Sequence, residues 1–284
     1  MTILVTGAAG MLGQDVVAEF QSRQCKVIVK DHSSLDITNL EHVYQVIDHY
    51  KPVIVVNCAA YTNVDKAESE SQKAYLINGL GPRNLALACN KNKAVLVQIS
   101  TDYVFDGRQN RPFGVYDPTN PVNVYGASKL WGETAVREIL KSFYIIRTSW
   151  LFGLNGKNFV DTMLLLGQSG RTIKVVDDQF GCPTFTEDLA RAIADLVETD
   201  CYGTYHITNQ NSTTWFGFAE NIFEKCNSSI KLIACNTEEM NRPAQRPGFS
   251  VLEPFPLKET IGYLLPGWDD ALSRYLVKRG KSKL

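Results

Sequence analysis

The sequence of 284 residues lacks an excess of charge of either sign, because 29 lysines and arginines are balanced by 30 aspartates and glutamates. A formal net charge of -1 gives no global field that would attract nucleic acid or an anionic membrane, so we expect neither as a partner. An anionic ligand would have to be held by local groups.

The chain also lacks a long uncharged hydrophobic run. Its first apolar stretch, Ile3–Val5, is too short for a secretory signal and breaks at Gly7. No other apolar run is long enough to cross a bilayer. These absences favour a cytoplasmic location.

Closely spaced cysteine pairs are missing as well. The seven cysteines are irregularly placed and none forms a CxxC pair, which indicates reduced thiols rather than a disulfide framework. The four histidines are scattered, without the spacing of a zinc site. We therefore predict no metal site.

What the sequence does contain is a regular alternation of apolar β-type runs and helical periods. From Leu12, for example, apolar residues recur at Val16 and Phe20, which is one face of a helix. Alternating strands and helices predict a doubly wound (Rossmann) parallel sheet of the α/β class, with its ligand crevice at the carboxyl ends of the strands. The expected strands are Thr2–Thr6, Lys26–Lys30, Val53–Asn57, Ala94–Ser100 and Phe143–Arg147; the expected helices after the first are Asn39–Tyr50, Ala74–Asn90 and Ser128–Leu140.

After about residue 151 the alternation loosens. We expect residues 1–150 to form a dinucleotide-binding domain, with later strands from about 173–208 added to it. Residues 151–284 would mainly form a smaller substrate-binding lobe, interleaved with the first domain. Within this half, Ile173–Val176 is a candidate sixth strand, Tyr205–Thr208 a further short strand and Phe216–Lys225 a helix.

A glycine-rich turn follows the first predicted strand, with Gly7, Gly10 and Gly13 enclosing Met11 and Leu12. In a dinucleotide site the three glycines allow a tight turn, close approach of the backbone to a pyrophosphate, and close packing of the helix on the sheet. Free amides at the helix start then face the phosphates. The alternative is a βα turn that binds nothing, since such motifs have false positives.

The end of the second strand bears on the choice of cofactor. Asp31 suits a free ribose 2′-hydroxyl, whereas a cation such as the neighbouring Lys30 suits a 2′-phosphate. The residues leave both NADP(H) and NAD(H) open, and we take NADP(H) as the preferred expectation.

Tyr125 and Lys129 are four residues apart, so on a helix they share one face. A nearby ammonium lowers the pKa of a phenol, and a tuned tyrosine can pass a proton to a carbonyl oxygen. Thr101, at the end of the fourth predicted strand, would lie at the same crevice. A dinucleotide, a hydroxyl and this pair together indicate carbonyl reduction, although the Tyr–Lys spacing alone is common on helix surfaces.

These motifs resemble the extended short-chain dehydrogenase/reductase family. Longer blocks resemble, within it, the dTDP-4-dehydrorhamnose reductases, and the similarity runs from residue 3 to at least residue 250. The blocks are Asn57–Glu68, Ser100–Gly107, Asn123–Gly126, Arg147–Trp150 and Asp178–Thr184.

The resemblance implies reduction of the C4 keto group of dTDP-4-dehydro-β-L-rhamnose to dTDP-β-L-rhamnose, in dTDP-rhamnose and polysaccharide biosynthesis. Tyr125 would donate the proton, and Lys129 would tune Tyr125 and hold the nicotinamide ribose. Thr101 would bind the carbonyl oxygen and Asp102 would help to hold the sugar.

Further binding residues are implied by the same resemblance. Trp150 would lie beside the sugar ring, although filling of the core is nearly as good an explanation from the sequence. Arg246 would approach the nucleotide end of the substrate, with Arg242 an equally good candidate. The strand end Ala59, Ala60 and Tyr61 would lie against the cofactor, Thr62 and Val64 at the substrate side, Asp36 and Ile37 near the adenine, and Asn158 and Phe159 are additional candidates for the substrate pocket.

Some members of the family use magnesium at a dimer interface. No acidic cluster in this sequence can be assigned to that role, since Glu187 and Asp188 are better explained as the charged first turn of a helix behind Thr186. Magnesium dependence and a homodimer are left open. Two other functions remain: a non-catalytic dinucleotide-binding subunit resembling the β subunit of methionine adenosyltransferase, and a different nucleotide-sugar reductase or epimerase.

Overall fold

A computed structural model describes residues 1–282 of the chain. Its centre is a six-stranded parallel sheet in the order β10-β5-β4-β3-β1-β2. The strands are β1 (Thr2–Thr6), β2 (Lys26–Lys30), β3 (Ile54–Asn57), β4 (Val95–Thr101), β5 (Phe143–Thr148) and β10 (Gly203–His206). The chain leaves β1 toward β2 on one side and returns to β3 on the other, so the crevice of the fold opens where β1 and β3 end.

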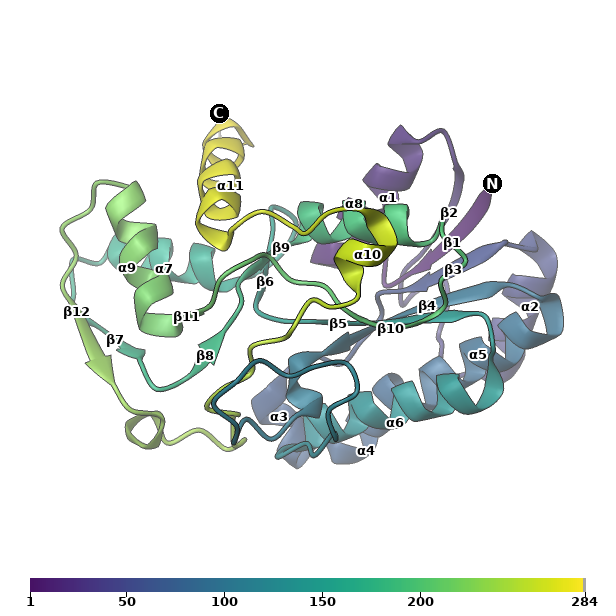
Figure 1. Ribbon diagram of the computed structural model, residues 1–284, viewed down its shortest axis with the longest axis horizontal. Coiled ribbons are helices and arrows are strands. Elements are labelled where there is room, and N and C mark those ends of the chain that lie inside the picture. The colour runs from purple at the N-terminus through teal and green to yellow at the C-terminus, as the bar shows by residue number, and fades with distance from the viewer. Residues whose placement is uncertain (283–284) are drawn as a thin grey trace.

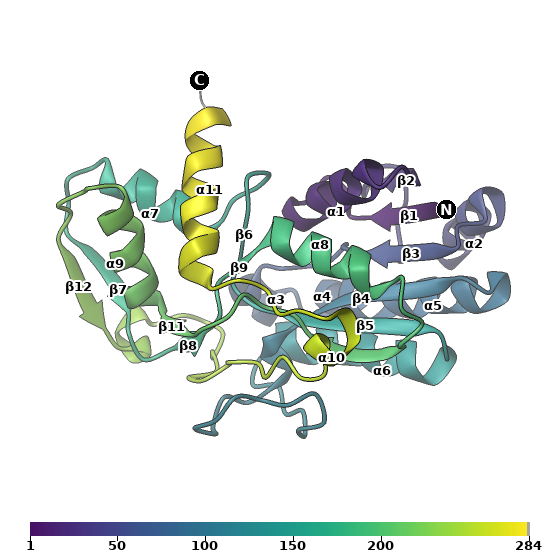
Figure 2. The ribbon, with the colours of Figure 1, turned by 45° about the horizontal axis from the view of Figure 1, so that its top comes forward.

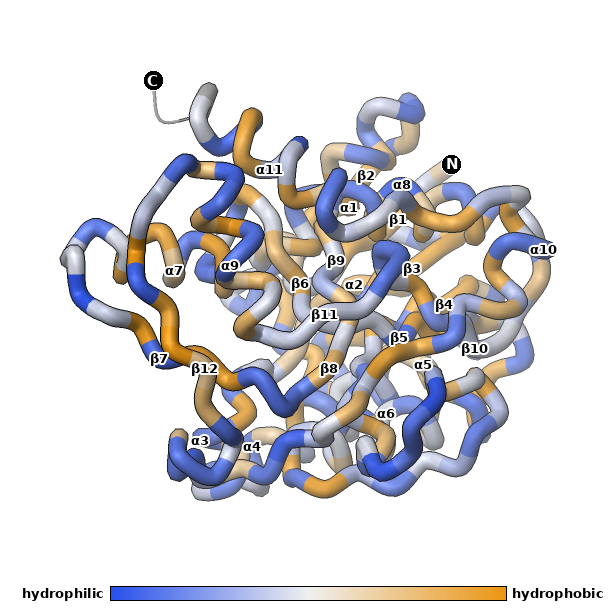
Figure 3. The backbone as a smooth tube through the Cα atoms, turned by 60° about the vertical axis from the view of Figure 1, so that its left-hand side comes forward, coloured by the Kyte–Doolittle hydropathy of each residue, from blue (hydrophilic) through white to orange (hydrophobic). Residues whose placement is uncertain are grey.

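Helices cover both faces of the sheet (Figures 1 and 2). One face packs on α1 (Met11–Ser22), α8 (Thr186–Leu196) and α10 (Leu257–Ile261). The other packs on α2 (Leu40–Tyr50), α5 (Gly81–Asn92) and α6 (Val124–Ile139). Successive strand residues point to opposite faces, so Ile3 and Val5 join the first core and Leu4 joins the second. Burial on both sides explains why the inner strands β1 and β3 are largely apolar along their length (Figure 3), whereas the edge strand β2 has a lysine at each end.

A smaller lobe stands beside the carboxyl ends of the strands (Figure 1). It is built from α7 (Phe159–Gly167), α9 (Trp215–Lys225), α11 (Trp268–Ser282) and the parallel pair β7 (Ile173–Val176) and β12 (Leu232–Cys235). Its own core is rich in aromatic side chains. Short strands link it to the crevice: β6 (Leu151–Phe152) with β9 (Thr184–Phe185), and β8 (Phe180–Gly181) with β11 (Thr213–Thr214).

The remaining elements lie between β3 and α6 or in the connections of the lobe. They are α3 (Val64–Ser69), α4 (Ser71–Tyr75), the π-helical turn η1 (Leu76–Leu80), and the 3-10 turns η2 (Asp102–Val104) and η3 (Thr237–Met240). Within residues 1–282, no helix is both long and apolar enough to pass through a membrane.

The predicted doubly wound sheet is confirmed, with three corrections to its elements. Ile173–Val176 is a strand but does not join the central sheet, because β12 supplies its partner in the lobe. The expected helix Ala74–Asn90 is divided by the π-helical turn η1. Helix α6 begins at Val124 rather than Ser128, because the Asn123 side chain accepts a hydrogen bond from the Gly126 amide and caps it there. The division into domains near residue 150 stays a prediction.

Candidate active site

The glycine turn has the close approaches that its sequence predicts. Gly7 has a φ of +63°, and a Cβ there would lie 2.5 Å from the Ala59 amide nitrogen. A Cβ on Gly13 would lie 2.3 Å from the Gly7 carbonyl oxygen. Helix α1 starts directly after Gly10 without a side-chain cap or an acidic residue in its first turn. Its first amides are thus suited to an anionic group.

The glycine turn opens on a cavity of about 550 Å³ at the ends of β3, β4 and β5. A separate cavity of about 630 Å³ lies elsewhere in the molecule. Most of the predicted site residues line the cavity of about 550 Å³, which is called the reaction cavity below. Predicted residues that line it are Gly10, Met11, Leu12, Gly13, Ala60, Thr62, Val64, Thr101, Asp102, Tyr125, Lys129 and Trp150. Lining residues that the sequence did not single out include Cys58, Ser100, Tyr103, Thr148, Ser149 and Lys157.

Tyr125 lies in the first turn of α6, beside Thr101 at the end of β4. Burial raises the pKa of Tyr125 to about 12, although a hydrogen bond with Thr101 opposes the rise and the Asp102 carboxylate adds to it. The Thr101 hydroxyl also donates to Asp102 Oδ1 at 2.8 Å. Burial raises the pKa of Asp102 itself to about 6. The cavity therefore contains a phenol that is protonated at neutral pH.

Lys129 lies one helical turn after Tyr125 and is buried. Its Nζ donates to the Ile99 carbonyl oxygen at 2.5 Å, and burial lowers its pKa to about 8. In this structure the pKa of Tyr125 is raised rather than lowered, and the tuning of Tyr125 by Lys129 stays a prediction. The loss of water around the phenol has the larger effect, and the opposing contribution comes from Thr101.

A buried ion pair behind Lys129 was not anticipated. Glu133 is fully buried one turn further along α6, where it accepts from Ser100 Oγ at 2.6 Å. Arg147 of β5 pairs with both Glu133 oxygens, through Nε at 2.9 Å and Nη2 at 2.8 Å. Arg147 holds the pKa of Glu133 below its usual value despite the burial. The signal in the sequence was an arginine inside an otherwise apolar strand.

A further cavity of about 420 Å³ adjoins the reaction cavity, since Val64 and Tyr103 line both. Phe159, Arg242 and Arg246 line this adjoining cavity. Arg246 forms a bidentate pair with Asp65, from Nη1 to Oδ1 and from Nη2 to Oδ2, each at 3.0 Å. Arg242 also pairs with Asp65, at 3.2 Å. Both arginines considered from the sequence therefore lie here, held by a carboxylate that was not singled out.

Other predicted residues lie outside the lining of the reaction cavity. Asp31 accepts hydrogen bonds from Ser33 and Ser34, which lower its pKa to about 2. Asp36 accepts hydrogen bonds from the Thr38 amide and hydroxyl, and Asn39 caps α2. Gly7 forms the turn behind the cavity, and Ile37 is buried against Gly81. The backbone amides of Ala59 and Tyr61 donate to the side-chain oxygens of Asn57 and Asn78, respectively. Asn158 caps α7.

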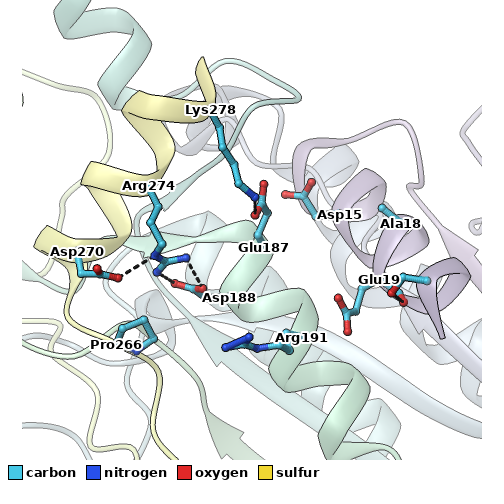
Figure 4. Close-up of a pocket in the computed structure, with 11 residues that line it drawn as sticks. Asp15, Ala18, Glu19, Glu187, Asp188, Arg191, Pro266, Asp270, Arg274 and Lys278 are labelled. Carbon is cyan, nitrogen blue, oxygen red and sulfur yellow. Dashed lines mark hydrogen bonds and ion pairs between the residues drawn. The ribbon is translucent and has the colours of Figure 1, made fainter. Parts of the chain in front are cut away.

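The cavity of about 630 Å³ lies between α1, α8 and α11 and shares no lining residue with the other two (Figure 4). Glu187 and Asp188 occupy the first turn of α8 as expected, but that helix begins at Thr186 itself, with Phe185 before it. Their charges are paired with α11: Asp188 with Arg274 at 2.6 Å, and Glu187 with Lys278. Within the described residues no set of histidine, cysteine and carboxylate side chains is arranged to hold a metal ion.

Comparison with known proteins gives a consistent result. Residues 1–280 match the family described as "RmlD substrate binding domain". The spore coat polysaccharide biosynthesis protein SpsK of Bacillus subtilis is 40% identical over 99% of this chain and 98% of its own length. A dTDP-4-dehydrorhamnose reductase of Streptomyces griseus is 44% identical over 88% of this chain and 84% of its own.

A solved structure agrees closely with this fold. The dTDP-4-dehydrorhamnose reductase of Bacillus anthracis, in complex with NADP, superposes with a TM-score of 0.95 at 41% identity, over 98% of this chain and 99% of the other. The resemblance seen in the sequence is therefore confirmed. The chain belongs to the RmlD substrate-binding family, that of the dTDP-4-dehydrorhamnose reductases.

Proposed function

We propose that this protein reduces the C4 keto group of dTDP-4-dehydro-β-L-rhamnose to dTDP-β-L-rhamnose, with NADPH as the preferred reductant. The observation that carries the proposal is that the glycine turn, Thr101, Tyr125 and Lys129 meet in one cavity. The Streptomyces griseus and Bacillus anthracis relatives are both named for this reaction. The product would serve polysaccharide biosynthesis, as the name of the Bacillus subtilis relative suggests.

The turn before α1 and the first amides of that helix suit a bound dinucleotide. The space beside Gly7 and Gly13 excludes any side chain, and the uncapped amides offer donors to a diphosphate. The hydrogen bonds that the Asp31 carboxylate accepts from Ser33 and Ser34 all fall on Oδ1, so Asp31 does not decide between the two cofactors; the preference for NADP(H) is supported by the Bacillus anthracis relative in complex with NADP. The bound nicotinamide supplies the hydride. Lys129, in the cavity wall, would bind its ribose.

The proton comes from the chain itself. A Tyr125 hydroxyl with a pKa of about 12 stays protonated at neutral pH and is a suitable acid toward the strongly basic oxygen of a carbonyl undergoing reduction. Thr101, whose single hydroxyl proton is donated to Asp102 Oδ1 in this structure, would redirect that proton to the oxygen of the bound substrate. Trp150 would support the apolar face of the deoxysugar, and Asp102 would bind the sugar.

The nucleotide end of the substrate would occupy the adjoining cavity. Arg246 lines this cavity, and a guanidinium suits diphosphate oxygens. Thr62 and Val64 would line the passage between the two spaces. A cytoplasmic location and a homodimer stay predictions from the sequence.

The test follows NADPH and NADH absorbance with purified chain and enzymatically made dTDP-4-keto-sugar. The proposal expects stoichiometric NADPH oxidation by the chain alone. A dinucleotide-binding subunit would bind cofactor without turnover, and an epimerase would return the cofactor unchanged after each cycle. Either of those results would contradict the reductase assignment.

A further inference from the structure

We propose that Trp215 is a positioning residue of the reaction cavity: stacked on Trp150, it holds that indole as a fixed wall for the sugar. This inference rests on the proposed function, because it assigns a role to the surface on which the sugar would lie. Trp215 starts α9 in the small lobe and lines the adjoining cavity, whereas Trp150 follows β5 and lines the reaction cavity.

The two indoles form a partition between the cavities. Their ring centroids are 3.5 Å apart and their planes differ by 6°. Aromatic pairs usually prefer offset or edge-to-face arrangements with centroids 4.5–7 Å apart, so the surroundings must hold this nearly eclipsed stack in place. Phe159 packs on the Trp215 ring at 4.6 Å and supports it within the lobe.

Trp150 is also held in an uncommon backbone conformation. Its φ is +48°, a region in which a bulky residue is an outlier. Such residues persist where neighbouring groups determine them, and they cluster at functional sites. Here the neighbouring Ser149 hydroxyl donates to the Cys182 carbonyl at 2.7 Å, and the Thr184 amide donates to the Trp150 carbonyl at 3.2 Å.

One small sheet positions both contacts of the Trp150 ring. In the β8–β11 pair, Gly181 lies opposite Thr213, two residues before Trp215. A Cβ on Gly181 would lie 2.4 Å from the Trp150 ring, so only glycine leaves room for its edge. Trp215 thus covers one face of the indole and Gly181 borders its edge. The lobe thereby determines where the wall of the reaction cavity stands.

The first test is Trp215→Leu, which removes the stacking partner of Trp150 and keeps an apolar side chain. We expect kcat/KM for the dTDP-4-keto-sugar to fall roughly 10- to 100-fold, because a small displacement of a substrate contact has effects of that size. Affinity for NADPH alone should be unchanged, since Trp215 does not line the reaction cavity. Trp215→Phe restores a flat aromatic face and should recover most of the lost activity.

A spectroscopic measurement reports the stack without any substrate. Two stacked indoles couple their electronic transitions, which gives paired circular-dichroism bands of opposite sign. The ring contacts of the other two tryptophans, Trp131 and Trp268, are with Tyr75 and Phe218. We expect the paired bands in the parent protein and their loss in Trp215→Leu.

Trp268→Leu is the matched control, because Trp268 packs in the same lobe core and lines neither cavity. It should lower the melting temperature while the paired bands and kcat/KM persist. Gly181→Ala approaches the same indole from its edge and should lower kcat/KM as Trp215→Leu does.

Equal kcat/KM in Trp215→Leu and Trp268→Leu, or paired bands that survive in Trp215→Leu, would overturn the inference and leave the reductase assignment standing. A parent protein that does not turn over the keto-sugar would instead defeat the proposed function.

Discussion

At the scale of single residues, burial dominates the chemistry of the site. It raises the pKa of Tyr125 to about 12 and lowers that of Lys129 to about 8, so at neutral pH the first keeps its proton and the second remains mostly charged. This pair has the protonation states that a proton donor and a ribose-binding cation require. Burial of the charged Lys129 ammonium should therefore lower the free energy of unfolding by a measurable amount.

We predict that Tyr125→Phe loses nearly all turnover and retains NADPH affinity, because it removes one hydroxyl and keeps the ring. Steady-state rates and NADPH titration by fluorescence check this. Tyr144→Phe, which removes the hydroxyl of a buried tyrosine that lines neither cavity, is the control and should remain active. An active Tyr125→Phe would remove Tyr125 from the mechanism.

Lys129→Met should stabilise the fold at pH 7 by on the order of 1–2 kcal/mol, after allowance for the lost hydrogen bond to Ile99. The folded pKa of about 8 lies below the reference value of 10.5, so the unfolded chain binds this proton more tightly. The parent therefore gains stability as pH rises from 8 to 10.5, and the advantage of Lys129→Met shrinks over that window.

Urea unfolding at pH 7 and pH 10 measures this difference. Lys26→Met, at an exposed lysine, should show no such pH dependence. A Lys129→Met protein whose advantage is absent at pH 7, or grows toward pH 10, would contradict the burial argument.

At the scale of elements, α6 carries the site. Tyr125, Lys129 and Glu133 recur every four residues, so one face of the helix presents all three to the ends of β4 and β5. Asn123 sets where the helix begins, and the Glu133–Arg147 pair fixes it to β5. The ion pair thus helps to position Lys129.

Glu133→Gln should destabilise the protein by about 3–5 kcal/mol, because it leaves the Arg147 guanidinium buried without its anion. Glu138→Gln changes an exposed residue of the same helix and should fall within about 0.5 kcal/mol of the parent. Both are read from chemical unfolding. Equal stability of the two variants would mean that Glu133 does not secure α6.

Element by element, the sequence predicted what depends on local pattern. The five expected strands agree with the structure to within one residue at each end, because a short run of apolar, β-type residues marks each of them in the sequence. Ile173–Val176 has the same pattern, yet it pairs with β12, since pattern alone does not choose a partner. Glu133 could have been noticed as a carboxylate one turn beyond Lys129.

Contacts between segments that are far apart in the chain could not be predicted from the sequence. The stack of Trp150 on Trp215 joins residues whose proximity depends on how the lobe sits against the sheet. Asp65 was part of a recognised block, but its pairing with Arg246 needed the three-dimensional fold. The sign of the pKa shift at Tyr125 was also inaccessible, because it depends on how deeply the hydroxyl is buried.

At the scale of the whole molecule, the two cavities meet where the sheet faces the lobe. Asp65, at the start of α3, binds two arginines of the C-terminal half and so connects the two parts of the chain across the adjoining cavity. Arg246 is mostly buried by this contact, with 14% of its side chain exposed. Its guanidinium is therefore oriented before any substrate arrives.

We predict that Asp65→Asn raises KM for the sugar nucleotide roughly 10-fold with little change in kcat, because the loss concerns binding remote from the reacting carbon. Initial rates over a range of substrate concentrations separate the two constants. Asp48→Asn breaks an exposed pair with Lys91 and should leave both unchanged. A fall in kcat with constant KM would contradict the proposed role of Asp65.

In the proposed reaction, hydride passes to the C4 carbonyl carbon of the dTDP-linked sugar while Tyr125 protonates its oxygen. The most direct measurement supplies NADPH carrying deuterium at the transferred position and locates the label in the product by NMR. We expect one deuterium on C4 of dTDP-β-L-rhamnose, formed in step with cofactor oxidation. Deuterium at another ring carbon, or a product without deuterium, would contradict it.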